Sequence, residues 1–214
     1  MSYTTLIDLC KNNKNITPEL IRELKDEIGM RDKDGRTALM WLCKNNGKIT
    51  PKLIRELKDE IGMIDSNEKT ALMLLCKNNR KITPKLIREL KDEIGMIDKY
   101  FNTALMHLCQ YNEKITSELI LELKDEIRMR DNIRYTALML LCGNNKNITP
   151  ELIREHKDEI GMKNNRRETA FMCLYQYNSS SITPELIREL KDEIGKQDNI
   201  EYTALMFLCY CNKK

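Results

Sequence analysis

A unit of 33 residues recurs along the whole 214-residue chain. The segment from Thr37 to Asp65 reads TALMWLCKNNGKITPKLIRELKDEIGMID, and the segment from Thr70 to Asp98 repeats it with two changes. A period of this length is typical of stacked arrays, in which each unit packs only on its neighbours. The sequence therefore predicts an all-α solenoid of about six and a half helix-turn-helix repeats, forming a single domain over 1–214. Its repeats are 4–36, 37–69, 70–102, 103–135, 136–168, 169–202 and, in part, 203–214.

The first half of each repeat predicts a short helix with one apolar face. In the second repeat, Thr37 is a suitable N-cap. The apolar residues of this helix share one side, and they are Ala38, Leu39, Leu42 and Cys43. Asn46 is expected to end the helix, because asparagine tolerates the left-handed backbone of a helix stop. Asn79, Asn112, Asn145 and Asn178 fill the same place in later repeats.

The second half predicts a longer helix that runs from the N-cap Thr50 to Gly62, with Pro51 at its first position. Its buried stripe is expected to consist of Leu53, Ile54, Leu57 and Ile61. The opposite face is charged, and we expect water to cover it. Its residues are Arg55, Glu56, Lys58, Asp59 and Glu60.

The stretch DKDGRTALMWLC, from Asp32 to Cys43, resembles the D-x-x-G-x-T-P-L-H-x-A-A opening of ankyrin repeats. The resemblance extends over the whole chain, and it implies paired helices, a projecting finger and a concave face that binds other proteins. The chain departs from the family pattern in its longer second helix, and only Gly35 keeps the glycine of the turn. We therefore expect a shortened finger. Tetratricopeptide repeats fit less well, because their aromatic, glycine and alanine pattern does not match TALM.

The copies differ mainly in two places, the four residues before each opening Thr and the outer positions of the first helix. Most aromatic residues lie there, and Tyr and Trp are frequent anchors of interfaces. Either these positions form a recognition surface, or they vary because little constrains them. The candidate partner-binding residues are Lys33, Arg36, Trp41, Lys69, Tyr100, Phe101, His107, Tyr111, Arg134, Tyr135, Arg166, Arg167, Tyr177 and Tyr202.

Charge is unevenly distributed between the two halves of the repeat. The second-helix segments together carry −9, whereas the whole chain carries +3, so the remainder carries +12. A basic binding face attracts acidic partners, and we predict a non-catalytic scaffold that binds a protein with an acidic surface. Nucleic acid is an unlikely partner, because the net charge is close to neutral. Self-association through uncapped ends of the stack is a further alternative.

The sequence shows no catalytic or metal-binding constellation, and we expect no enzymatic activity and no cofactor. Six of the eight cysteines share one position of the repeat, which is typical of buried apolar residues rather than of disulfides or zinc ligands. These six are Cys10, Cys43, Cys76, Cys109, Cys142 and Cys209. No apolar run is long enough to span a membrane, and the chain begins without a secretory signal. We therefore expect a cytoplasmic or nuclear location.

Overall fold

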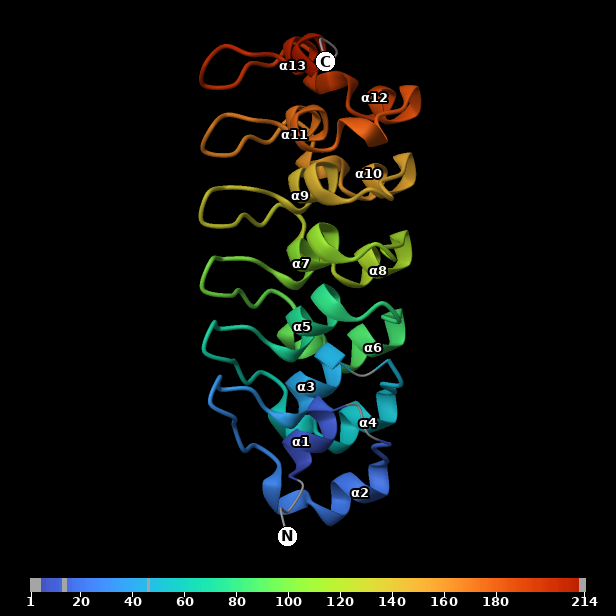
Figure 1. Ribbon diagram of the computed structural model, residues 1–214. Coiled ribbons are helices and arrows are strands. Elements are labelled where there is room, and N and C mark those ends of the chain that lie inside the picture. Colours follow the sequence, from blue (N-terminus) through green and yellow to red (C-terminus); the bar gives the residue numbers. More distant parts are fainter. Residues whose placement is uncertain (1–4, 13–14, 46, 212–214) are drawn as a thin grey trace.

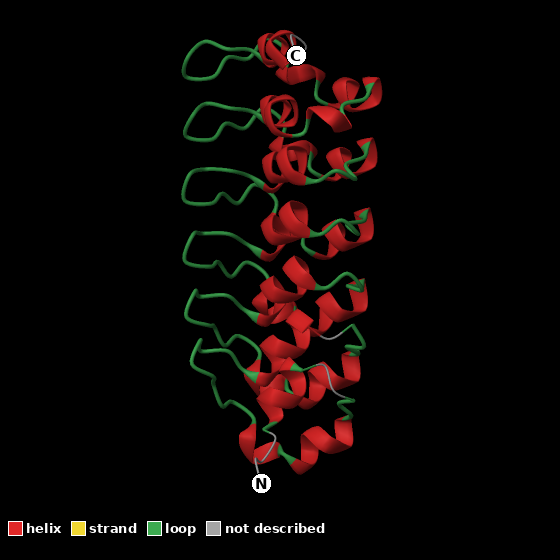
Figure 2. Cartoon of the chain, in the orientation of Figure 1, coloured by secondary structure: helices red, strands yellow, loops and turns green. Residues whose placement is uncertain are grey.

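The chain forms a straight file of stacked helical repeats, with its two termini at opposite ends (Figure 1). The structure, a computed structural model, describes residues 5–12, 15–45 and 47–211. Each repeat contributes a first helix in the middle layer, a second helix on one side and a loop that projects on the other (Figure 2). Apart from one isolated bridge between Gln197 and Thr203, the described residues contain no strand. The prediction of an all-α solenoid is confirmed.

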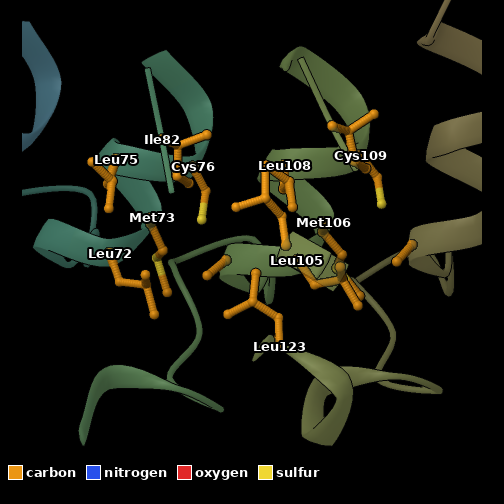
Figure 3. Close-up of a cluster of buried hydrophobic side chains, with 14 of the residues drawn as sticks. Leu72, Met73, Leu75, Cys76, Ile82, Leu105, Met106, Leu108, Cys109 and Leu123 are labelled. Atoms are coloured by element: carbon orange, nitrogen blue, oxygen red, sulfur yellow. The ribbon is translucent and has the colours of Figure 1, made fainter. Parts of the chain in front are cut away.

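The first helices build the continuous core. They are α1 (Leu6–Lys11), α3 (Ala38–Asn45), α5 (Ala71–Asn78), α7 (Ala104–Tyr111), α9 (Ala137–Asn144), α11 (Ala170–Tyr177) and α13 (Ala204–Cys211). The predicted Thr caps are confirmed in α5, where Thr70 Oγ1 accepts the Met73 N–H at 3.3 Å. Figure 3 shows the apolar side chains of α5 and α7 in equivalent positions of neighbouring repeats. Burying each leucine stabilises the stack by about 1.5–3 kcal/mol.

The second helices are shorter than the sequence predicts. They are α2 (Pro18–Glu23), α4 (Pro51–Glu56), α6 (Pro84–Glu89), α8 (Ser117–Glu122), α10 (Pro150–Glu155) and α12 (Pro184–Glu189). A tight 3₁₀ turn follows each of these helices, and these turns are η1 (Lys25–Glu27), η2 (Lys58–Glu60), η3 (Lys91–Glu93), η4 (Lys124–Glu126), η5 (Lys157–Glu159) and η7 (Lys191–Glu193). A further turn, η6 (Ser179–Ser181), lies in the loop that carries one extra residue. The expectation of one helix from Thr50 to Gly62 was therefore wrong.

The 3₁₀ turn brings a glutamate into the seam between repeats. Glu126 is fully buried, and its carboxylate accepts the N–H of Leu105 at 2.6 Å and the N–H of Gly95 at 2.9 Å. One side chain thus caps the first helix of its own repeat and joins the preceding repeat. Glu60 occupies the same place and is 1% exposed, so the prediction that water covers it was wrong. Burial raises the pKa of Glu126 above its ordinary value.

The asparagine after the first helix has a different role from the one predicted. Asn112 has a φ of −99°, outside the left-handed region, and is 3% exposed. Its Nδ2 donates to the carbonyl oxygens of Cys76 and Asn79, both at 3.1 Å, and its Oδ1 accepts the Lys114 N–H at 2.9 Å. The amide therefore ties the end of one first helix to the preceding repeat. Asn46, on which the prediction was based, lies outside the described residues.

Arginines on the outer face of the second helices form ion pairs between repeats. Arg22, Arg55 and Arg88 each pair with a glutamate of the next repeat, namely Glu56, Glu89 and Glu122. Leu121 takes the place of the arginine in the fourth repeat and is 52% exposed, so this row of pairs is interrupted there. Arg22, Arg55 and Arg88 are therefore matched within the protein itself, although the second-helix segments together carry a net charge of −9.

Candidate functional site

Each projecting loop, called a finger here, is folded by one acidic or amide side chain at its base. In the third finger, Asp98 Oδ1 accepts the N–H of Tyr100 at 2.9 Å and of Asn102 at 3.0 Å. The Asp98 carbonyl oxygen accepts the Phe101 N–H at 2.8 Å. This tight turn forces the residue two before the opening Thr into the left-handed region. The fingers project from one side of the stack (Figure 2), and their shortening relative to the family pattern stays a prediction.

Glycine occupies that left-handed position only in the first finger, where Gly35 has a φ of 74°. The later fingers place other residues there with φ between 60° and 66°, namely Glu68, Phe101, Arg134, Arg167 and Glu201. For a residue with a β-carbon, this backbone conformation costs about 1–2 kcal/mol of conformational free energy. These five residues, which we call the fingertip residues, are all exposed. Local strain without compensating packing is typical of functional positions.

Backbone hydrogen bonds join neighbouring fingers into a continuous row. The Asn132 N–H donates to the Tyr100 carbonyl at 3.0 Å, and the Asn165 N–H donates to the Ile133 carbonyl at 3.1 Å. Equivalent bonds join the first finger to the second, the second to the third and the fifth to the sixth. The fingertip side chains are therefore held at a regular spacing on a rigid support.

Three candidate residues at the bases of the fingers are bridges between repeats. Arg36 pairs with Asp65 at 3.4 Å, and Lys69 pairs with Asp98 at 3.0 Å. Tyr135 Oη donates to Glu168 Oε2 at 3.1 Å. Arg36, Lys69 and Tyr135 are all half-buried. Their polar groups bind side chains of the next repeat, so these three residues connect neighbouring fingers and leave little polar surface for a binding partner.

Trp41 and His107 are buried, contrary to the expectation that their position faces outward. Trp41 is 6% exposed and donates from Nε1 to Asp32 at 2.8 Å, whereas His107 is 3% exposed and lies 3.1 Å from Asp98. Both side chains contact the base of the finger that precedes their helix. We therefore exclude both from the proposed binding surface.

The environment of His107 keeps the imidazole neutral and Asp98 ionised. Burial lowers the pKa of His107, despite its hydrogen bond to Asp98. Burial alone would raise the pKa of Asp98, but hydrogen bonds from His107 and Lys69 outweigh it and hold that pKa well below its ordinary value. The cluster is a buried structural network with no access to a substrate.

Exposed aromatic residues gather on the fingers and on the neighbouring side of the first helices. Tyr100 is 49% exposed, Tyr111 is 47%, Tyr177 is 50% and Tyr202 is 40%. The Lys77 ammonium lies 4.2 Å from the centre of the Tyr111 ring, a cation–π arrangement. We call these four tyrosines and the fingertip residues, together with the residues between them on the fingers, the finger face.

Two adjoining hollows, each of about 270 Å³, lie on this face. Both are lined by Ile133, Tyr135 and Tyr177, and one extends to Arg166 while the other extends to Gln110. Pockets for small molecules usually enclose about 300–1,000 Å³. These hollows are at the lower limit, which suits single side chains of a protein partner better than a cofactor.

Lys99, on the third finger, is an exposed cation, and so are four of the predicted partner-binding residues, Lys33, Arg134, Arg166 and Arg167. Within residues 5–12, 15–45 and 47–211, none of the four forms an ion pair. This distinguishes the fingers from the second helices, whose arginines are mostly paired. The finger face therefore presents unmatched positive charge beside exposed aromatic rings.

The buried cysteines and the second histidine offer little reactivity. Burial raises the pKa of the thiols of Cys43, Cys76, Cys109 and Cys142, and that of Cys10 to about 12. His156 Nε2 lies 3.6 Å from Cys109 Sγ, and both groups are inaccessible. Cys209 belongs to a stretch whose side chains lie outside the described part of the structure. No group of three metal-binding side chains occurs among the described residues.

Within the described ranges, none of the helices has the length and apolar character needed to cross a membrane.

Comparison with known proteins identifies related repeats. Residues 6–94 match a family model described as ankyrin repeats in three copies. The ankyrin repeat domain of Bcl-3, a member of the IkappaB protein family, superposes with a TM-score of 0.67 at 16% identity, over 96% of this chain and 94% of that one. A chain from the complex of the Bdellovibrio bacteriovorus predatory endopeptidase Bd0816 with immunity protein Bd3460 superposes with a TM-score of 0.63 at 17% identity. That match covers 90% of this chain and all of that chain. Comparison with curated protein sequences gave no match.

Proposed function

Because this chain belongs to the ankyrin-repeat family, we propose that it binds another protein through its finger face. Ankyrin repeats generally mediate protein–protein interaction and are typically non-catalytic. The observation that supports this face is the exposure of Tyr100, Tyr111 and Tyr177 beside arginines that form no ion pair with the described residues. Large aromatic residues and arginine carry much of the binding energy in protein interfaces.

The partner that this surface favours is an acidic protein. Arg134, Arg166 and Arg167 lie on two adjacent fingers, and none of them forms an ion pair with a carboxylate in the part of the chain that the structure describes. Opposite charge on a partner accelerates association and selects the correct orientation. The second helices are a poorer binding surface, because Arg22, Arg55 and Arg88 already hold glutamates of the next repeat.

The experiment is a capture assay with the native host's extract, followed by binding measurements on the captured partner. Tyr100, Tyr111 and Tyr177 are replaced together by alanine. We expect affinity to fall at least a hundredfold, since each exposed anchor contributes on the order of 1 kcal/mol or more. The melting temperature should change little, because the three rings are about half exposed. Unchanged affinity in this variant would contradict the proposed face.

A matched control replaces Leu121, which is exposed on the second-helix side, with alanine. It removes a comparable apolar group on the other side of the stack, so affinity should stay as in the wild type. A partner sensitive to Leu121 and insensitive to the tyrosines would place binding on the second helices instead. If the captured ligand is a nucleic acid, affinity will fall steeply with salt, and the proposal of a protein partner fails.

A further inference from the structure

The fingertip residues form an ordered series of side chains, one on each finger. From the second finger to the sixth, they are Glu68, Phe101, Arg134, Arg167 and Glu201. The series is therefore acidic, aromatic, basic, basic and acidic. Backbone hydrogen bonds between neighbouring fingers fix this order in space.

The central three fingertip side chains, those of Phe101, Arg134 and Arg167, are exposed. Phe101 is 53% exposed, and neither Arg134 nor Arg167 forms an ion pair with any described residue. All three occupy a left-handed backbone position that glycine adopts without strain. Ion pairing among the described residues does not explain the two arginines, and about half of the Phe101 side chain is left uncovered by the fold.

We propose that the fingertips of the third, fourth and fifth repeats bind an acidic, extended polypeptide segment that carries one large apolar residue. Phe101 contacts the apolar residue, and Arg134 and Arg167 pair with two carboxylates. Arg166, on the same finger as Arg167, adds a second cation at that end. This inference rests on the proposed function, and it specifies the partner and the contacts.

The spacing of the repeats sets the register of the bound segment. Packed helices lie about 8–10 Å apart, and an extended chain advances about 3.3 Å per residue. Neighbouring fingertips are therefore matched by every third residue of the segment. The expected pattern is one apolar residue and two acidic residues at successive intervals of three, in either chain direction.

Glu68 and Glu201 limit the length of the acidic stretch. Each carries a negative charge on the fingertip next to the central three, and neither forms an ion pair among the described residues. Further carboxylates on the partner would meet repulsion at these fingers. The partner segment is thus acidic over the fourth and fifth repeats and is neutral or basic beyond them.

The probe is a random peptide library displayed on phage and selected on the immobilised full chain. We expect enriched peptides to combine one large apolar residue with acidic residues at intervals of three. The best peptide is then synthesised with a fluorescent label, and its affinity is measured by anisotropy. A second synthetic peptide, with every Asp and Glu replaced by Asn and Gln, should bind at least tenfold more weakly.

The fingertip positions offer matched variants, because glycine relieves the same backbone strain at each of them. Phe101→Gly and the double variant Arg134→Gly with Arg167→Gly should each weaken the peptide at least tenfold. Glu68→Gly and Glu201→Gly should bind it as tightly as the wild type or more tightly. All four variant proteins should melt at the wild-type temperature or a few degrees higher, so lost binding cannot be assigned to lost folding.

Three results would overturn the inference: enriched peptides that are neutral or basic, binding of Phe101→Gly within twofold of the wild type, or an equal loss of binding in Glu68→Gly. The proposed function can survive each of them. A native partner that is lost with the tyrosine variants but bound normally by the fingertip variants would show that binding uses the first-helix side of the finger face.

Discussion

The asparagine that follows each first helix provides the sharpest test of how the repeats are joined. Asn112 makes three hydrogen bonds through its side chain, two of them to the preceding repeat. Each such bond contributes about 0.5–1.5 kcal/mol to stability. Replacement of Asn112 by glycine removes all three and adds chain flexibility that destabilises the fold by roughly 0.5–1 kcal/mol. We therefore expect the variant to be about 2–5 kcal/mol less stable.

The glycine variant distinguishes two explanations for the asparagine at this position, a left-handed helix end and hydrogen bonding to the preceding repeat. If Asn112 were chosen for a left-handed helix end, glycine would be neutral or stabilising. The assay is urea unfolding of the full chain followed by circular dichroism. The control is Asn78→Ala, because Asn78 donates only to Leu74 of its own helix and should change stability by less than about 0.5 kcal/mol. An Asn112→Gly protein as stable as the wild type would refute the hydrogen-bonding role.

Three further predictions concern the charged network, the outer face and the thiols. Asp98→Asn should destabilise the fold by about 2–3 kcal/mol at pH 7. Because folding lowers the pKa of Asp98, its stabilising effect is complete above the unfolded value of about 4 and is lost progressively as the pH falls from there through the lower folded pKa. The stability difference from the wild type should therefore shrink when urea unfolding is repeated at decreasing pH, and a constant difference would contradict this. Leu121→Arg should place a cation near Glu155, with a gain of at most about 0.5 kcal/mol by urea midpoint because the site is exposed; a clear loss would show that Leu121 packs usefully. In the native protein, a thiol reagent should label Cys76 and Cys109 only as fast as the chain unfolds, and rapid labelling would contradict their burial.

The repeat pattern was enough to predict the stack, because equivalent apolar positions in every copy can be buried only against neighbouring copies. Ala71, Leu72, Leu75 and Cys76 are buried as expected. The Thr caps were also predictable, since their backbone requirement is local. Gly62 has the predicted left-handed backbone, with a φ of 85°, but it follows the 3₁₀ turn rather than the end of the α-helix.

The polar contacts between repeats could not be predicted in the same way. Lys58, Asp59 and Glu60 are equally constant among the copies, and nothing in the sequence separates the buried glutamate from its exposed neighbours. The asparagine was noticed, but a local backbone rule explained it as well as a contact to another repeat. In both cases the decisive hydrogen bonds join residues that are more than twenty positions apart.

The variable positions divided into two groups that the sequence could not separate. Trp41 and His107 are buried against the base of the preceding finger, whereas Phe101 and Arg134 lie on the exposed fingertips. In both groups, a large residue in one repeat is replaced by a smaller or chemically different residue in other repeats. Only the position of each side chain relative to the finger shows whether a variable residue is buried between repeats or lies on the exposed surface.

Hydrogen–deuterium exchange of the full chain, with and without the captured partner, tests most directly whether the finger face is the binding surface. We predict that the partner slows exchange in the fingers at 99–101, 132–134 and 165–167 and in the adjoining ends of α7 and α11. The second helices α6, α8 and α10 should exchange at unchanged rates. Protection confined to those second helices, with the fingers unaffected, would contradict the assignment of the finger face.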